Sequence, residues 1–222
     1  RTNRLLLCQG FPACVSWSTV TTFLPDFLHS DQGLCVESAT LLVACFGISC
    51  LLWALSGAAL GTHVYRKNKS HLAYVMAFFT ALAVAPFLLL INSSPDLLRS
   101  QRDGGLGASR SEELPSAWAF CLTVLGGCAA VANPNLKGLL MNVNAPNTRG
   151  TVFALVTLTD DVGKGLGPEV VALGIWVFGR RIALSAAMGC WTLSAVCLYC
   201  TKWTIQKDVQ RIEMAQKLPL NV

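Results

Sequence analysis

Charged side chains are scarce in this sequence. They make up 13% of its 222 residues, against roughly 25% in an ordinary soluble domain. Hydrophobic residues make up 53%, and they fall in blocks of about twenty, the length that a helix needs to cross roughly 30 Å of hydrocarbon. The shortage of charge therefore excludes an ordinary soluble protein and indicates an integral membrane protein.

Signatures of catalysis and cofactor binding are also missing. The sequence has no GxGxxG motif and no zinc or serine-nucleophile signature, and His29, His63 and His71 stand alone in loops or at block edges. The alternation typical of strands is absent as well, which excludes a membrane β-barrel. We expect an all-α protein that is not an enzyme and has no cofactor or metal site.

Ten cysteines are present, but all except Cys35 lie inside apolar blocks, where a thiol behaves as a small hydrophobic group. Cys197 and Cys200 have CxxC spacing, yet no histidine or second CxxC accompanies them. We interpret both as packing residues.

Six apolar blocks predict six transmembrane helices. The blocks span residues 5–28, 37–61, 71–92, 115–141, 150–178 and 181–201. Residues 1–201 should form one six-helix bundle, and residues 202–222 a cytosolic tail. In the tail, Ile205, Val209 and Ile212 recur at helical spacing beside basic residues, which favours either a short helix on the inner membrane surface or a solvated, frayed segment.

Basic residues are unevenly divided between the two sides of such a bundle. The side with both termini holds Arg1, Arg4, Arg66, Lys67, Lys69, Arg149, Lys202, Lys207, Arg211 and Lys217. The other side holds Arg99, Arg102, Arg110, Arg180 and Arg181. Because Lys and Arg concentrate in cytosolic loops, we expect both ends of the segment in the cytosol. The net charge of +5 then reflects topology and implies no nucleic-acid partner.

Two further features concern the limits of the bundle. The Gly- and Ser-rich stretch 93–114 is expected to be a flexible extracytosolic connector. The sequon at Asn92 lies so near the membrane edge that glycosylation is not expected. The sequence begins at Arg1 without an initiator Met, and apolar sequence follows almost at once, so we expect a fragment of a longer polypeptide.

The fifth predicted span carries charges near its middle. Asp160 follows Arg149, the expected cytosolic edge, by eleven residues, or about 16 Å of helix. A charge in mid-membrane costs about 2.5 to 3.5 kcal/mol, while each Leu, Val or Phe returns only about 0.3 to 0.6 kcal/mol. Asp160, Asp161 and Lys164 outweigh their apolar neighbours, so their face must border other helices or a watery cavity.

Two roles are compatible with these charges. Lys164 can pair with either Asp160 or Asp161 at helical spacing, and such a pair can serve only to hold helices together. Alternatively, the carboxylate left without a cation takes up a proton or contacts substrate. Glu169, on roughly the opposite face, is expected at a gate or rim. An intramembrane enzyme using both aspartates is disfavoured, because neighbouring side chains diverge by about 100°.

Gly163, Gly165, Gly167 and Pro168 weaken the same helix. Proline lacks a backbone donor and clashes with the preceding turn, so a kink or break is expected here. Transporters use such interruptions to place backbone dipoles beside substrate or ions. Close packing of small residues against another helix is the alternative.

The join between the second and third spans contains a family motif. Gly57 and Gly61 form a GxxxG pair, which alone indicates a helix contact face, and Arg66 and Lys67 follow it. Gly57, Arg66 and Lys67 match the G-x-x-x-D-x-x-G-R-K-like loop of the major facilitator superfamily, which this sequence therefore resembles. Gly61 and Val64 replace the Asp and the second Gly of that motif, so the resemblance does not extend to the gate-locking role of the Asp.

A longer match covers residues 142–168, which resemble the loop between the tenth and eleventh helices of that superfamily and the eleventh helix itself. The matching residues are Pro146, Arg149, Gly150, Gly163, Gly167 and Pro168. The arrangement is similar to the spinster-like branch.

The resemblance covers essentially the whole chain and implies the C-terminal half of a twelve-helix secondary transporter. The implied partners are the lipid bilayer, the missing N-terminal six-helix half and a small organic or lipid-like substrate moved by alternating access. Proton coupling would use Asp160 or Asp161. The alternative is a receptor or assembly subunit that keeps the fold without transport. Under either interpretation the protein lies in the plasma membrane or in an endomembrane.

The resemblance also implies which spans face the other half: the first, second, fourth and fifth. The fourth span contains Asn133 and Pro134, which are expected at a helix break or gate. Lys137, in the inner half of the same span, is expected to reach toward the cytosolic edge.

Overall fold

The computed structural model describes residues 1–98 and 115–217, with side chains up to Met214. Its helices are α1 (Thr2–Thr22), α2 (Leu24–Ser30), α3 (Val36–Lys67), α4 (His71–Leu82), α5 (Val84–Asn92), α6 (Pro95–Leu98), α7 (Ala117–Gly126), the 3-10 helix η2 (Gly127–Val131), α8 (Ala132–Asn142), α9 (Arg149–Phe178), α10 (Arg180–Cys200) and α11 (Lys202–Lys217). The described residues contain no β-strand, so the all-α prediction is confirmed. Most of the expected connector, residues 99–114, lies outside them.

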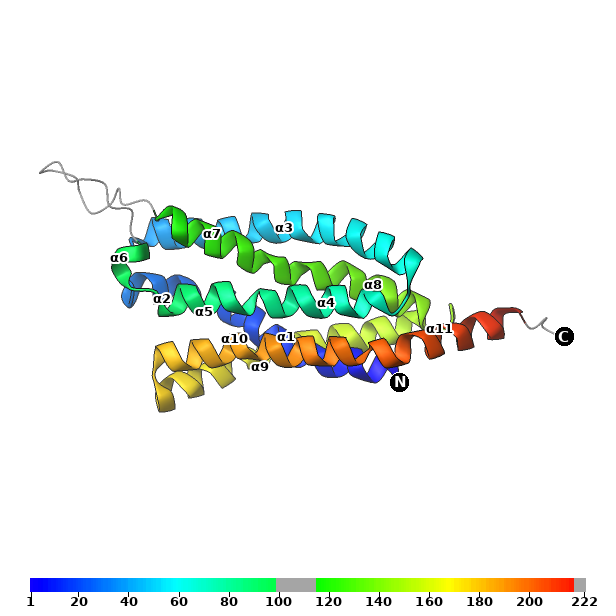
Figure 1. Ribbon diagram of the computed structural model, residues 1–222. Helices are drawn as coiled ribbons and strands as arrows, with labels where there is room; N and C mark the ends of the chain where they lie inside the picture. Colours follow the sequence, from blue (N-terminus) through cyan, green and yellow to red (C-terminus); the bar gives the residue numbers. More distant parts are fainter. Residues whose placement is uncertain (99–114, 218–222) are drawn as a thin grey trace, which may run out of the picture.

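The helices lie alongside one another, and successive long segments alternate in direction (Figure 1). The α3–α4 turn, the α8–α9 turn, the N-terminus and α11 lie at one end of the bundle, whereas the α2–α3 and α9–α10 turns lie at the other. The loops therefore separate into the same two groups that the sequence analysis used to assign orientation.

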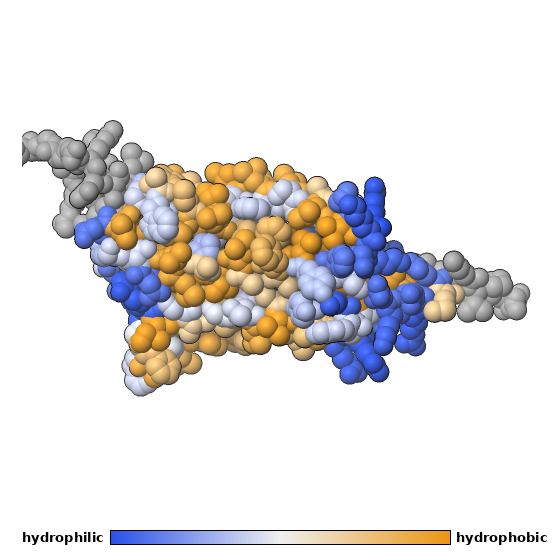
Figure 2. Space-filling model, in the orientation of Figure 1, coloured by the Kyte–Doolittle hydropathy of each residue, from blue (hydrophilic) through white to orange (hydrophobic). Residues whose placement is uncertain are grey.

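Four segments in the described part of the chain are long and apolar enough to cross a membrane. They are Val36–Lys67, His71–Asn92, Ala117–Asn142 and Arg180–Cys200. Hydrophobic residues cover the middle of the bundle, and hydrophilic ones gather toward its ends (Figure 2). The helices α1 and α9 have 21 and 30 residues, but they are not among the four, because polar and charged side chains interrupt them. Composition thus supports four of the six expected spans.

Short interruptions divide three of the long segments. The chain passes from α1 to α2 at Phe23, from α4 to α5 at Ala83, and from α7 to α8 through η2. Pro25 and Pro86 lie in the first turns of α2 and α5, where a helix does not need the N–H that proline lacks.

The fifth long segment differs from the prediction. α9 continues without a break through Pro168, so of the kink or break expected over Gly163–Pro168, a break is absent. Most of the stability of a protein helix comes from its packing, and α9 packs closely along α1. This contact compensates for the weak local helix propensity of the Gly-Pro segment.

The core divides into two clusters along the bundle. Around its middle, Trp17, Phe46, Phe87 and Trp191 form a ring of aromatic contacts with centroid separations of 5.4 to 5.6 Å, and Trp191 is fully buried. The second cluster lies toward the end with the N-terminus and α11 and includes Leu139. The aromatic cluster connects α1 to α3, α5 and α10, and so fixes the position of α1.

The tail is helical over the described residues 202–217, which excludes a frayed segment there. Ile205 and Val209 are buried in the second core cluster with Leu6. The protein's own helices therefore cover two of the three apolar residues that were expected at the membrane surface, and Ile212 is half-buried.

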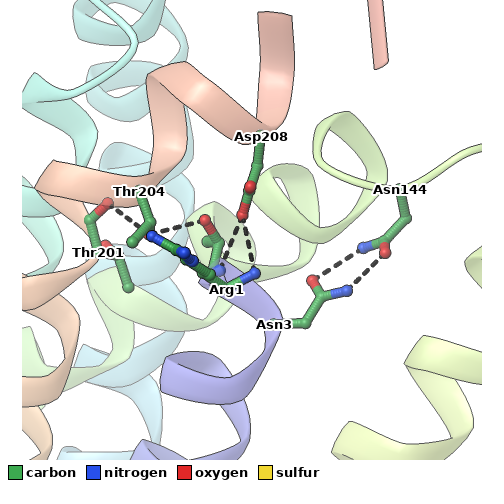
Figure 3. Close-up of polar contacts among 7 residues, drawn as sticks. Arg1, Asn3, Asn144, Thr201, Thr204 and Asp208 are labelled. Atoms are coloured by element: carbon green, nitrogen blue, oxygen red, sulfur yellow. Dashed lines mark hydrogen bonds and ion pairs between the residues drawn. The ribbon is translucent and has the colours of Figure 1, made fainter. Parts of the chain in front are cut away.

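Polar contacts fix α11 against the start of α1 (Figure 3). Asp208 accepts a hydrogen bond from the backbone N–H of Thr2 at 2.8 Å, and the Thr2 hydroxyl donates to Thr204 Oγ1 at 2.8 Å. Beside them, the amides of Asn3 and Asn144 exchange two hydrogen bonds of 2.6 and 3.1 Å. These contacts join the tail, the first helix and the α8–α9 turn at one end of the bundle.

Candidate functional site

A cavity of about 550 Å³ lies between α1, α8 and α9. Its polar lining includes Gln9, Ser18, Asn133, Lys137, Asp160 and Lys164. Ligand sites in proteins are typically concave spaces of about 300 to 1,000 Å³ with mostly apolar walls and a few polar groups. The volume and the mixed lining make this cavity the candidate binding site.

Asp160 is the acidic residue that borders the cavity. Its side chain is partly buried against α1, whereas that of Asp161 is 62% exposed. A Cβ atom on Gly10 would lie 2.7 Å from Asp160 Oδ1, and Cys14 of the same helix lies beside the carboxylate. The absence of a side chain at Gly10 therefore makes room for the carboxylate between α1 and α9.

Lys164 pairs with the other aspartate. Its Nζ lies 3.4 Å from Asp161 Oδ1, and the two side chains are 58% and 62% exposed. Of the two pairings that the spacing allows, the structure shows this one. Asp160 has no ion-pair partner within 4.0 Å in the described part of the chain, so the two neighbouring aspartates occupy different environments.

Two of the glycines bring α9 close to α1. A Cβ on Gly163 would lie 2.7 Å from Cys14 Cβ, and one on Gly167 would lie 2.4 Å from Ser18 Oγ. Gly165 is exposed and has no neighbour within 4 Å of such an atom. The close-packing interpretation therefore describes Gly163 and Gly167, and Gly165 takes no part in this contact.

The fourth long segment contributes α8 to the cavity. Asn133 and Pro134 lie in the first turn of α8, just after the 3-10 helix η2, so an interruption lies close to these two residues. Asn133 and Lys137, one turn apart, both line the cavity, whereas Pro134 borders a second pocket of about 260 Å³ beside Gly61. Lys137 therefore lies at the cavity wall and not only at the end of the bundle.

The predicted loop motif lies apart from the main cavity. Gly57 and Gly61 are buried where α3 packs against η2 and α8, as expected for a contact face. Arg66 and Lys67 are exposed in the last turn of α3, where positive charge complements the helix dipole.

Two other predicted residues also lie away from the cavity. Arg149 begins α9, and its Nε donates to the carbonyl oxygen of Asn144 at 3.3 Å. Glu169 is exposed, does not line the cavity and is separate from Asp160.

Two residues that line the cavity, Cys14 and Gln9, are not among the predicted site residues. Cys14 contacts Asp160, and Gln9 accepts a hydrogen bond from Ser194 of α10 at 3.0 Å. Both contacts depend on the register between α1 and helices more than a hundred residues later in the chain. The only local sign was the unusual number of polar residues in the first span.

Comparison with known proteins gives one family and one fold. A sequence profile described as Major Facilitator Superfamily matches residues 1–168. A crystal structure of a mutant peptide transporter, POT, in complex with alafosfalin is similar in fold, with a TM-score of 0.61 over 96% of this chain and 15% sequence identity. The chain spans 44% of the length of that transporter. No curated protein matches the chain.

Proposed function

Because the chain belongs to the Major Facilitator Superfamily, we propose that it forms the C-terminal six-helix half of a secondary transporter of the spinster-like branch. Nearly all of its fold aligns with less than half of a peptide transporter, which supports a second half of similar size. In this proposal α1 and α9 complete the six spans, and both termini of the segment lie in the cytosol with the basic residues of that end.

The polar character of α1 and α9 supports a second body of protein beside them. Asp161 and Lys164 are more than half exposed. Placing such a charge in hydrocarbon costs about 2.5 to 3.5 kcal/mol. An N-terminal half placed against this face, with water between the halves, would remove that cost. The cavity between α1, α8 and α9 would then open toward the interface between the halves.

The proposed mechanism is alternating access. Rocking of two bundles about a site near the midplane exposes that site to one side and then the other. The close contact of α1 with α9 through Gly163 and Gly167 suits movement of these helices as one rigid unit. The cavity volume of about 550 Å³ suits a small organic or lipid-like solute.

We assign proton coupling to Asp160, and one observation carries this assignment. Asp160 borders the cavity without an ion-pair partner among the described residues, while Lys164 already pairs with Asp161. A partly desolvated carboxylate without a cation favours its protonated form more than a paired one does. Asp160 is therefore the group whose charge changes when solute and proton share the cavity.

The test uses the full-length transporter in proteoliposomes under an imposed pH gradient. A transported compound is first identified with a panel of labelled solutes. Asp160→Asn should abolish gradient-driven accumulation and leave solute exchange intact, because the neutral amide mimics the protonated acid. Asp161→Asn is the matched control and should keep the gradient dependence. Wild-type gradient dependence in both variants would refute proton coupling through this pair.

A further inference from the structure

We propose that the cavity binds the anionic head group of a small amphipathic solute through Lys137. The inference names the substrate class of the proposed transporter and so rests on the same cavity. On the cavity wall the fold already neutralises one of the two cations, Lys164, by its pair with Asp161.

Lys137 is the cation of the cavity that lacks a counterion. Its side chain is exposed and lines the cavity from α8, and no ion pair or hydrogen bond within the described ranges engages its ammonium group. The other cavity cation, Lys164, is paired with Asp161 at 3.4 Å. An unpaired ammonium group on the wall of a cavity attracts an incoming negative charge.

The net charge of the cavity supports the same sign of ligand. The charged groups on its wall are Lys137, Asp160 and Lys164, and Asp161 compensates Lys164 from the outer face of α9. With Asp160 protonated, as the proposed proton coupling requires, the wall keeps one uncompensated positive charge. A cationic solute would add a second positive charge, whereas an anionic solute neutralises the first.

Neighbouring residues add a hydrogen-bond donor and an apolar surface. Asn133 lies one helical turn before Lys137 on the same wall, and no protein group within the described residues occupies its amide. Trp17 and Phe153 line the cavity as well, and they offer aromatic surface to the apolar part of a ligand. The combination suits an amphipathic anion.

A lysine also limits how strongly the site can discriminate between anionic head groups. An ammonium group acts as a compact point charge with three rotatable donors, whereas arginine presents a planar fork. We therefore expect the site to accept both carboxylate and phosphate groups, and hexanoate and hexyl phosphate represent these two sources.

The experiment measures binding of hexanoate, hexyl phosphate and hexylammonium to the purified full-length protein. We expect both anions to bind more tightly than hexylammonium, and Lys137→Gln to weaken each anion by about tenfold or more, as expected for a lost hydrogen bond to a charged group. Lys137→Arg should retain most of the affinity. Lys207→Gln, an exposed lysine of α11 away from the cavity, is the control and should bind like wild type.

Equal affinity of wild type and Lys137→Gln for the anions, or equal affinity of wild type for hexylammonium, would overturn the inference. If Lys137→Gln does not fold, acylation of the wild type decides the question. Bound hexyl phosphate should protect Lys137 from an amine-reactive reagent and leave Lys207 unprotected; equal labelling of Lys137 with and without the ligand would also overturn it.

Binding and flux separate this inference from the proposed function. Anion binding without transport would remove the transporter assignment and keep the anion site. Transport of a neutral or cationic solute without anion binding would remove only the inference about Lys137.

Discussion

Asn135 Nδ2 of α8 donates a hydrogen bond to the Gly57 carbonyl oxygen of α3 at 2.9 Å. The same amide nitrogen also donates to Val131 O at 2.8 Å, and Asn135 Oδ1 lies over Gly61, where a Cβ would be only 1.6 Å away. The GxxxG pair therefore contacts α8 through a buried amide and not only through van der Waals packing. A second helix must approach closely at both glycines for this amide to be satisfied.

The close approach predicts that Gly61→Ala destabilises the bundle. The new methyl group would displace Asn135 and weaken its bond to Gly57, and overpacking of this kind costs about 1 to 3 kcal/mol. Gly47→Ala is the control on the same helix, because no atom lies within 4 Å of its Cβ position; it should stabilise the helix by about 0.5 to 1 kcal/mol. Thermal unfolding in detergent measures both, and equal midpoints would contradict the role of Gly61.

The contact of Gly10 with Asp160 predicts a variant that alters coupling more than stability. A methyl group on Gly10 would lie 2.7 Å from Asp160 Oδ1, so the flexible carboxylate should swing away from α1. We expect Gly10→Ala to lower gradient-driven uptake by about tenfold, since small displacements of an essential group have effects of this order or larger. The unfolding midpoint should change little. Gly165→Ala, with open space around it, should leave uptake unchanged; an equal loss in both variants would contradict the prediction.

The tail contact predicts a dependence of stability on acid pH. Burial alone raises the pKa of Asp208, but hydrogen bonds from the Thr2 backbone and side chain lower it, and the pKa lies below its ordinary value of 3.8. A lowered carboxyl pKa gives stability above the unfolded value and loses it as the pH falls through the folded value. The stabilising contribution of Asp208 to the free energy of unfolding should therefore be complete above about pH 5 and should be lost as the pH falls below about 3.8.

The measurement is the unfolding midpoint of the wild type and of Asp208→Asn between about pH 5 and pH 2.5. The difference between the two proteins should be largest at the upper end of this range and should shrink as the acid becomes protonated. Parallel curves at every pH would show that Asp208 does not titrate in the contact.

The positions of the helices follow from the sequence because the membrane signal is local. The block predicted at 37–61 becomes α3, Val36–Lys67, and the block at 181–201 becomes α10, Arg180–Cys200. Hydropathy over about twenty residues is enough for such predictions. The first and fifth blocks, which were also predicted as spans, form the helices α1 and α9, but their polar residues keep them out of the four segments that length and composition support.

The details of the site depend on distances that no local pattern contains. Spacing allowed Lys164 to pair with either aspartate, and the approach of α1 at Gly10 and Cys14 places Asp160 on the inner side and leaves Lys164 with Asp161. Of the kink or break and the close packing that the Gly-Pro stretch allowed, α9 shows close packing at Gly163 and Gly167 and no break before Pro168, because the partner helix supplies contacts that local propensity does not contain. Tertiary packing routinely overrides weak helix propensity.

The pairing of α1 with α9 has a consequence for biogenesis. α1 ends at Thr22 and α9 begins at Arg149, so the ribosome completes the three intervening apolar segments before the partner of α1 emerges. Neither of the two polar helices carries enough apolar surface to partition into lipid strongly by itself. In the proposed six-span arrangement, the translocon or an insertion chaperone would therefore retain α1 until α9 arrives, and the two helices would enter the bilayer as a cooperative unit.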